Sequence, residues 1–89
     1  MITAVVLITA EKSALPKLGE DLAAIPGVSE VYSVTGDIDF IAMVRAKEHD
    51  DLADIVTRRI AQVSGVARTQ THVAFKAFSK HDLETLFAP

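Results

Sequence analysis

Val34-Thr35-Gly36-Asp37-Ile38-Asp39-Phe40 is the stretch that decides how the rest of the chain is arranged. Apolar and β-branched residues flank a Gly-Asp pair, a pattern typical of two strands that turn back on each other. Glycine adopts positive φ angles without strain, and an Asp side chain hydrogen-bonds readily to nearby backbone, so the pair suits a tight turn. We therefore predict a β-hairpin with its turn at Gly36-Asp37, at one edge of a sheet.

The segments around this hairpin follow the order strand, helix, strand, strand, helix, strand. Their hydrophobic patterns predict strands over 2–9, 28–35, 39–45 and 66–77. Two apolar stripes at helical spacing predict the helices: Leu15, Leu18, Leu22 and Ile25 in the first, and Leu52, Val56, Ile60 and Val63 in the second. Ser13 is expected to cap the first helix, with Pro16 in its first turn.

This order contains a faint internal repeat, because Pro26-Gly27 and Ser64-Gly65 each end a helix just before a strand. Two such halves predict an α+β fold, a ferredoxin-like βαββαβ sandwich with a four-stranded antiparallel sheet and two helices on one face. We expect one domain over 1–78. Residues 79–89 are predicted to form a short C-terminal helix or tail of the same domain, carrying Leu83, Leu86 and Phe87.

Composition narrows the class of protein further. The formal net charge of −3 argues against direct nucleic-acid binding, because such domains usually carry a basic stripe. The chain has no cysteine, which excludes disulfides and thiolate metal sites and fits a reducing compartment. Its apolar start lacks a basic segment before it and is too short to span a bilayer. We expect a cytoplasmic protein without a membrane segment.

The sheet is expected to carry more apolar surface than two helices can cover. Along the first strand Val6 and Ile8 point one way and Val5 and Leu7 the other, and the third strand repeats this pattern. A contiguous apolar surface of this kind usually marks an interface. The sequence therefore predicts a homodimer that packs sheet against sheet, a dimeric α/β-barrel type of assembly.

Neither catalysis nor cofactor binding is indicated by the side chains. His49, His72 and His81 lack metal-ligand spacing, and the serines, threonines and glycines form no nucleophile or phosphate-binding motif. We therefore predict no metal, no cofactor and no enzymatic activity. An alternative is a small dimeric ferredoxin-like enzyme with a sheet-lined pocket, in which His72 or an acid carries the chemistry.

Two threonines in the last strand are candidate ligand contacts. Thr69 and Thr71 share one face of that strand, with Gln70 on the other, so both hydroxyls are available to one small polar ligand. Threonine is also a good strand former, and the hairpin acids also suit a solvated turn. If the last strand lies near the Gly36 turn of a neighbouring subunit, turn and hydroxyls would line one small crevice.

At this point the chain resembles the RAM domain (regulation of amino-acid metabolism), the effector domain of the Lrp/AsnC family. The family's turn reads Gly-x-Tyr/Phe-Asp followed by an apolar residue. Gly36, Asp39 and Phe40 match it, whereas Ile38 replaces the usual aromatic residue. Both helix-to-strand boundaries also carry the resemblance, together with the last strand: Ile25-Pro26-Gly27-Val28, Val63-Ser64-Gly65-Val66 and Thr69-Gln70-Thr71. In total the resemblance covers nearly the whole chain.

The resemblance implies dimers that pair through their sheets and assemble into rings, typically octamers of four dimers. It implies that a small effector, usually an amino acid, binds in crevices between dimers. The ligand-binding residues would be those of the turn, with the two threonines as further contacts: Gly36, Asp37, Ile38, Asp39, Thr69 and Thr71.

Full-length family members carry an N-terminal helix-turn-helix domain, whereas this chain begins directly at the first strand. We therefore expect a stand-alone RAM protein that takes part in transcription regulation without binding DNA itself. A full-length Lrp/AsnC regulator is a candidate partner. The further alternatives are an ACT-like regulatory module and an oligomerisation adaptor without a ligand.

Overall fold

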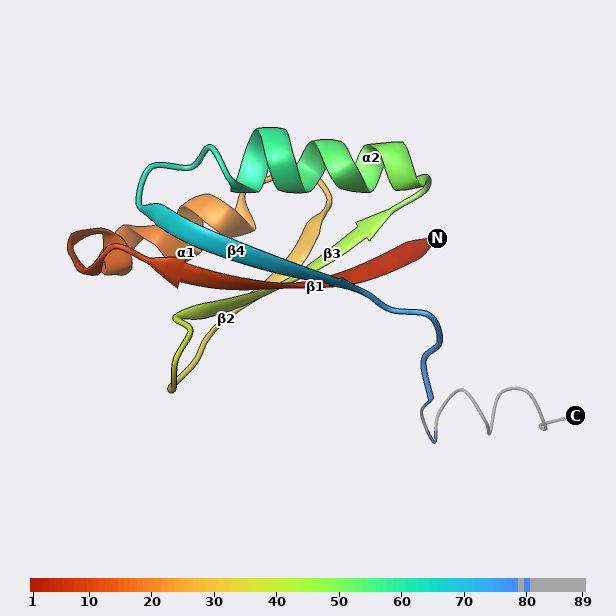
Figure 1. The fold of residues 1–89 in the computed structure, drawn as a ribbon, viewed down its shortest axis with the longest axis horizontal. Coiled ribbons are helices and arrows are strands. Elements are labelled where there is room, and N and C mark those ends of the chain that lie inside the picture. The colour runs from red at the N-terminus through yellow and green to blue at the C-terminus, as the bar shows by residue number, and fades with distance from the viewer. Residues whose placement is uncertain (79, 81–89) are drawn as a thin grey trace, which may run out of the picture.

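The computed structural model describes residues 1–78 and residue 80. Its sheet consists of β1 (Ile2–Ala10), β2 (Val28–Ser33), β3 (Phe40–Ala46) and β4 (Val66–Val73), in the spatial order β2-β3-β1-β4. All neighbouring strands are antiparallel. Helices α1 (Leu15–Ala23) and α2 (His49–Asp54) cover one face of this sheet (Figure 1). The predicted ferredoxin-like βαββαβ sandwich is confirmed. The predicted tail helix falls on residues 79–89, which, apart from residue 80, lie outside the described part of the chain.

The core lies between the sheet and the helices. Alternate residues of the two central strands face this layer and are buried: Ala4, Val6 and Ile8 of β1, and Phe40, Ala42, Val44 and Ala46 of β3. Leu18 and Leu22 of α1 pack against them, and both are almost completely buried. Each buried leucine contributes about 1.5–3 kcal/mol. These two leucines hold α1 on the sheet, as the sequence predicts, whereas Leu15 of the predicted stripe is exposed and Ile25 lies beyond the end of α1.

The second helix departs from a simple α-helical stripe. After α2 the chain continues as a π-helical segment, η2 (Ile55–Ile60), and the Ala61 N–H donates to the Val56 carbonyl at 2.9 Å. The wider π turn brings residues five apart onto nearly the same side, so Ile55 and Ile60 are both buried. The predicted stripe was therefore only partly right, because Val56 is merely half-buried.

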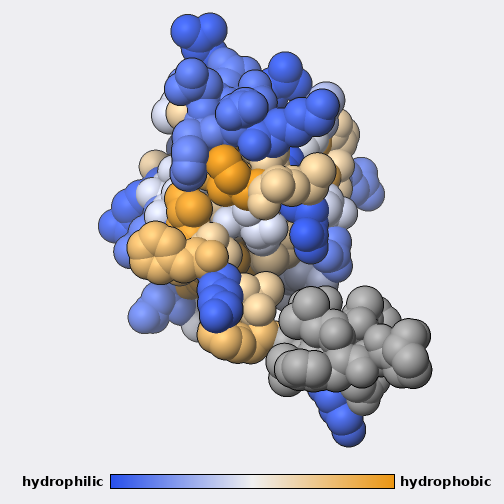
Figure 2. Space-filling view, turned by 90° about the vertical axis from the view of Figure 1, so that its right-hand side faces the viewer, coloured by the Kyte–Doolittle hydropathy of each residue, from blue (hydrophilic) through white to orange (hydrophobic). Residues whose placement is uncertain are grey.

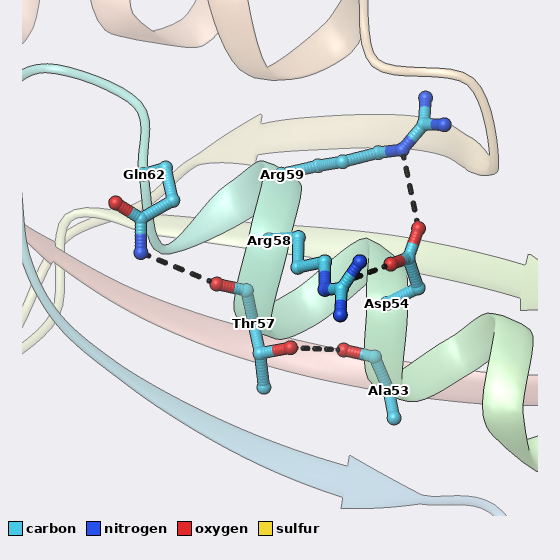
Figure 3. Close-up of polar contacts among 6 residues, drawn as sticks. All are labelled: Ala53, Asp54, Thr57, Arg58, Arg59 and Gln62. Atoms are coloured by element: carbon cyan, nitrogen blue, oxygen red, sulfur yellow. Dashed lines mark hydrogen bonds and ion pairs between the residues drawn. The ribbon is translucent and has the colours of Figure 1, made fainter.

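Polar contacts along the outer surface of this helix are drawn in Figure 3. The Thr57 hydroxyl donates to the Ala53 carbonyl at 2.7 Å, and Asp54 pairs with Arg58 at 3.4 Å and with Arg59 at 3.7 Å. These charged groups are largely exposed, and exposed ion pairs contribute little to stability. The buried isoleucines, rather than these contacts, hold the helix in place.

The predicted cap of the first helix was wrong. Helix α1 begins after Ala14, and Ser13 lies instead in a short 3₁₀ helix, η1 (Lys12–Ala14). A capping serine at 13 would accept a hydrogen bond from the N–H two or three residues later, but Pro16 has no N–H. The chain closes this turn with a backbone bond from the Ala14 N–H to the Glu11 carbonyl at 3.0 Å.

The predicted end of the last strand was also wrong. Strand β4 ends at Val73 instead of Ala77, and the last backbone bond runs from the Ala74 N–H to the Thr3 carbonyl at 2.9 Å. Because the neighbouring strand β1 begins at Ile2, the residues after Ala74 have no strand to pair with. The sequence of residues 74–77 did not extend the strand past the end of its partner.

The sheet face opposite the helices is apolar and uncovered within one copy of the chain. Val5 and Leu7 of β1 and Ile41 and Met43 of β3 lie on it, each half-buried. We call this surface the open face. In Figure 2 the outer surface of the helix layer is hydrophilic, whereas hydrophobic groups gather at and below the level of the sheet. Within the described residues, no helix is long and apolar enough to cross a membrane.

Substituting glycine at two turns of the chain, Gly36 and Gly65, gives a first test of the fold. Gly65 and Gly36 both have φ above 100°, but an added Cβ would overlap Ala14 at Gly65 and would meet open space at Gly36. We expect Gly36→Ala to lower the free energy of unfolding by about 1–2 kcal/mol, from the backbone conformation alone. Gly65→Ala should cost roughly 1–3 kcal/mol more, because the Ala14 contact is overpacked.

Urea denaturation of both variants at one fixed protein concentration measures this difference. Equal losses for the two variants would show that the helix η1 does not pack on Gly65 as described.

Candidate functional site

The hairpin that the sequence singles out is a loop rather than a tight turn. Strands β2 and β3 pair up to Ser33 and Phe40, so residues 34–39 form the connection and the two-residue turn was wrong. The Val34 N–H donates to the Asp39 carbonyl at 3.0 Å and closes the base of the loop. In Figure 1 the loop descends from the sheet on the side opposite the helices. It therefore stands at one end of the open face.

Asp39 fixes this loop to the central strand. Its N–H donates to the Ile8 carbonyl at 2.9 Å, and its Oδ2 accepts the Ala10 N–H at 2.7 Å. The pairing of β1 with β4 shifts register between Thr9 and Ala10, at the point where Asp39 reaches the strand. On the other side of β1 the pairing with β3 ends at Ile8 and Phe40, so the Ala10 N–H has no β3 carbonyl opposite it and the Asp39 carboxylate takes the place of one.

A hollow of about 340 Å³ lies between the loop and the sheet. The register pairs Leu7 with Gln70 and Thr9 with Arg68, so these four residues project onto the open face. Ile38 reaches the hollow from the loop. The residues that line the hollow are Leu7, Thr9, Ile38, Arg68, Thr69 and Gln70. The volume is at the lower end of the range of about 300–1,000 Å³ that is usual for small-molecule pockets.

The structure brings only part of the predicted ligand set together. Ile38 and Thr69 both border the hollow. Gly36 and Asp37 are exposed in the loop outside its lining, and the Asp39 carboxylate is bonded to β1. Whether these loop residues contact a ligand stays a prediction.

The two threonines share one face of β4, as the sequence predicts. Thr69 pairs with Ile8 and Thr71 with Val6, which places both side chains on the helix side of the sheet. It is therefore the backbone of Thr69, on an edge strand, that borders the hollow. Thr71 is not among the lining residues.

Sequence reasoning missed Arg68 and Gln70, which occupy the same face as Thr9 and Leu7. Their spacing of two residues in a predicted strand was a usable signal, because alternate strand residues share a face. Among the described residues, the ion pairs are made by Lys17, Arg58 and Arg59, and none involves Arg68. Of the described residues that line the hollow, Arg68 is the one with a cationic side chain.

A hydrogen-bonded pair lies on the far edge of the sheet, on β2. The Tyr32 hydroxyl donates to the Glu30 carboxylate, and this bond raises the pKa of the phenol, with the negative charge of Glu30 adding to the rise. Tyr32 therefore keeps its proton to a higher pH than an ordinary tyrosine.

The fold and the hollow define a ferredoxin-like α+β domain with space for a small molecule. The Lrp/AsnC ligand binding domain model matches residues 3–83, and the chain belongs to this family. An uncharacterised HTH-type transcriptional regulator of Pyrococcus furiosus is 37% identical over 59 residues, which are 66% of this chain and 39% of that protein. The chain thus spans well under half the length of this curated relative. A segment of a homocitrate synthase of Sulfurisphaera tokodaii is 40% identical over 55 residues, 62% of this chain but 12% of that enzyme.

Solved structures agree with this assignment. The crystal structure of TTHA0845 from Thermus thermophilus is 48% identical, with a TM-score of 0.83 over 90% of this chain and 100% of that one. A feast or famine regulatory protein from M. tuberculosis, complexed with L-methionine, is 28% identical, with a TM-score of 0.75 over 89% of this chain and 53% of that one. Our chain is therefore comparable in size to the ligand-binding domain of such regulators.

The Asp39 contacts lead to a second prediction. Asp39→Ala should lower the free energy of unfolding by about 1–3 kcal/mol, because the Ala10 N–H loses a charged acceptor. Asp37→Ala, two residues away and exposed, is the matched control and should change it by less than about 0.5 kcal/mol.

Chemical denaturation measures both variants, and amide hydrogen exchange reports on the Ala10 N–H directly. Unchanged protection of that amide in Asp39→Ala would contradict the proposed anchoring of the loop.

Proposed function

We propose that this chain is a small-molecule-sensing effector module of the Lrp/AsnC type, with an amino acid as its ligand. The observation that carries the proposal is the hollow beside the hairpin loop, in a chain whose family is a ligand-binding domain. The L-methionine complex of the M. tuberculosis relative supports an amino acid as the ligand class. Ligand binding would occur at the end of the open face, where loop and sheet meet.

The module would act as an oligomer in the cytoplasm. Two copies would pack through the part of the open face that does not line the hollow, because Val5, Ile41 and Met43 are partly exposed to water in one copy. At about 25 cal/mol per Å² of apolar area, a shared interface of roughly 800 Å² per partner outweighs typical association costs. Such dimers would assemble further into an octamer or a similar ring, and could join a full-length regulator that contacts DNA.

The enzyme alternative receives less support from the hollow. His72 lies on the open face opposite Val5, but it is not among the residues that line the hollow. Among the described residues the lining also contains no carboxylate, so these residues offer no evident general base. Binding without chemistry is the function that these side chains support.

Ligand binding is tested by a thermal-shift screen of the standard amino acids at millimolar concentration. A ligand present at about one hundred times its Kd stabilises the folded state by about 2.7 kcal/mol, which raises the melting temperature by several degrees. We expect at least one amino acid to do so. If none does, the ligand-free adaptor is favoured and the proposal fails.

Gly36→Val then tests whether the loop is part of the site. A β-branched residue at φ 112° forces the loop out of its conformation and moves Ile38, so ligand binding should be lost while the oligomer persists. Thr35→Val is the matched control, because it places the same side chain one position earlier, where φ is not positive. Ligand binding retained by Gly36→Val would place the site elsewhere.

Assembly is tested with Ile41→Glu, which puts a carboxylate in the middle of the open face. Sedimentation equilibrium should give a dimer or larger species for the wild type and a folded monomer for the variant. Ala53→Glu adds the same charge on the exposed outer side of α2 and should leave the mass unchanged. A stable wild-type monomer at micromolar concentration would refute the sheet-to-sheet dimer.

A further inference from the structure

The hollow combines one cationic side chain with two neutral polar side chains and two aliphatic ones. Arg68 supplies a guanidinium group, Gln70 an amide and Thr9 a hydroxyl, whereas Leu7 and Ile38 are purely apolar. Arg68 and Thr9 are register partners, and Gln70 lies two residues along the same face, so the polar groups stand at neighbouring positions. This set suits a small molecule that has an anionic end and an apolar body.

Arg68 has no anionic partner among the described residues, although the chain contains more acids than bases. An arginine guanidinium presents its N–H groups as a planar fork, which matches the two oxygens of a carboxylate. Leu7 and Ile38, both half-buried, provide an apolar wall beside it for the body of the ligand. The natural complement of Arg68 in this hollow is therefore a ligand carboxylate.

Among the described residues, no side chain that lines the hollow carries a negative charge for an ammonium group. Asp37 and Asp39 flank Ile38 in the chain, but the Asp39 Oδ2 accepts the Ala10 N–H at 2.7 Å and holds the loop on β1. Asp37 is exposed outside the lining. Because Arg68 and Gln70 are exposed, an ammonium group bound here would stay largely hydrated, and without an anionic partner among the described lining residues it gains little.

We propose that Arg68 binds the carboxylate of the effector and that the hollow selects small apolar carboxylic acids whether or not they carry an α-amino group. Gln70 and Thr9 add hydrogen bonds at the carboxylate end, and Leu7 and Ile38 contact the apolar body. By this reasoning α-oxo acids bind at least as tightly as the corresponding amino acids. This inference rests on the proposed function, because it assigns the ligand class of that same site.

The experiment is calorimetric titration of the intact protein with three leucine-sized probes that share one apolar body. These are α-ketoisocaproate, which has a carboxylate and no ammonium, L-leucine, which has both, and L-leucinamide, which has only the ammonium. We expect wild type to bind α-ketoisocaproate at least as well as L-leucine and to bind L-leucinamide roughly tenfold or more weakly.

Arg68→Gln should weaken α-ketoisocaproate binding about tenfold to one-hundredfold, because a charge-assisted bidentate bond is lost. Arg45→Gln is the matched control. It removes the same side chain from β3 at the far end of the sheet, where its register partner is Thr3, and should bind as wild type does. Circular dichroism of both variants at the titration concentration verifies that they are folded.

The outcomes separate this inference from the proposed function. If L-leucine binds and α-ketoisocaproate does not, the ligand class is wrong while amino-acid sensing stands. Equal affinity of wild type and Arg68→Gln for both acids likewise overturns the role of Arg68 alone. If α-ketoisocaproate binds through Arg68 and no amino acid binds, the inference holds and the amino-acid ligand is wrong. If no probe and no standard amino acid binds to the wild type, the proposed function and the inference both fail.

Discussion

The central strand β1 is apolar on both faces, and the chain supplies helices for only one of them. On the helix side Ala4, Val6 and Ile8 are completely buried. On the other side Val5 and Leu7 stay half-exposed beside Ile41 and Met43. Alternate residues of the same strand thus belong to the core and to the open face, so a change in the register of β1 would disturb both surfaces.

The candidate site depends on how the hairpin loop is tied to this strand. Within the loop, backbone bonding closes only the base, between Val34 and Asp39. The position of the loop relative to the sheet comes from the two bonds between Asp39 and β1. Without them only the paired base of the hairpin would hold the loop, and Ile38 would be free to move away from the other residues that line the hollow. Asp39 of the turn motif therefore anchors the loop to β1, a structural role that its position in the sequence does not reveal.

Sequence reasoning succeeded where the physics is local and periodic. Leu18 and Leu22 are buried where the first helical stripe places them. The order of strands and helices along the chain follows from the positions of the apolar runs and of the Gly-containing boundaries. It was less accurate where contacts between different segments decide where a helix or strand begins and ends. Ser13 lost its capping role to a 3₁₀ turn, and β4 stopped at Val73 because β1 offers no further partner. The π-helical turn at Ile55–Ile60 buries both of these isoleucines, which regular α-helical spacing does not predict.

The sequence by itself determined the class of fold, the apolar excess of the sheet and the fact that Thr69 and Thr71 share a face. Alternation along a strand fixes which residues lie together, but it does not say which face they occupy. Only the tertiary structure decided that, because pairing β4 with β1 places Thr71 on the helix side and Arg68 and Gln70 on the open face. The side chains that line the hollow come from three segments far apart in the chain, and long-range pairing alone brings them together.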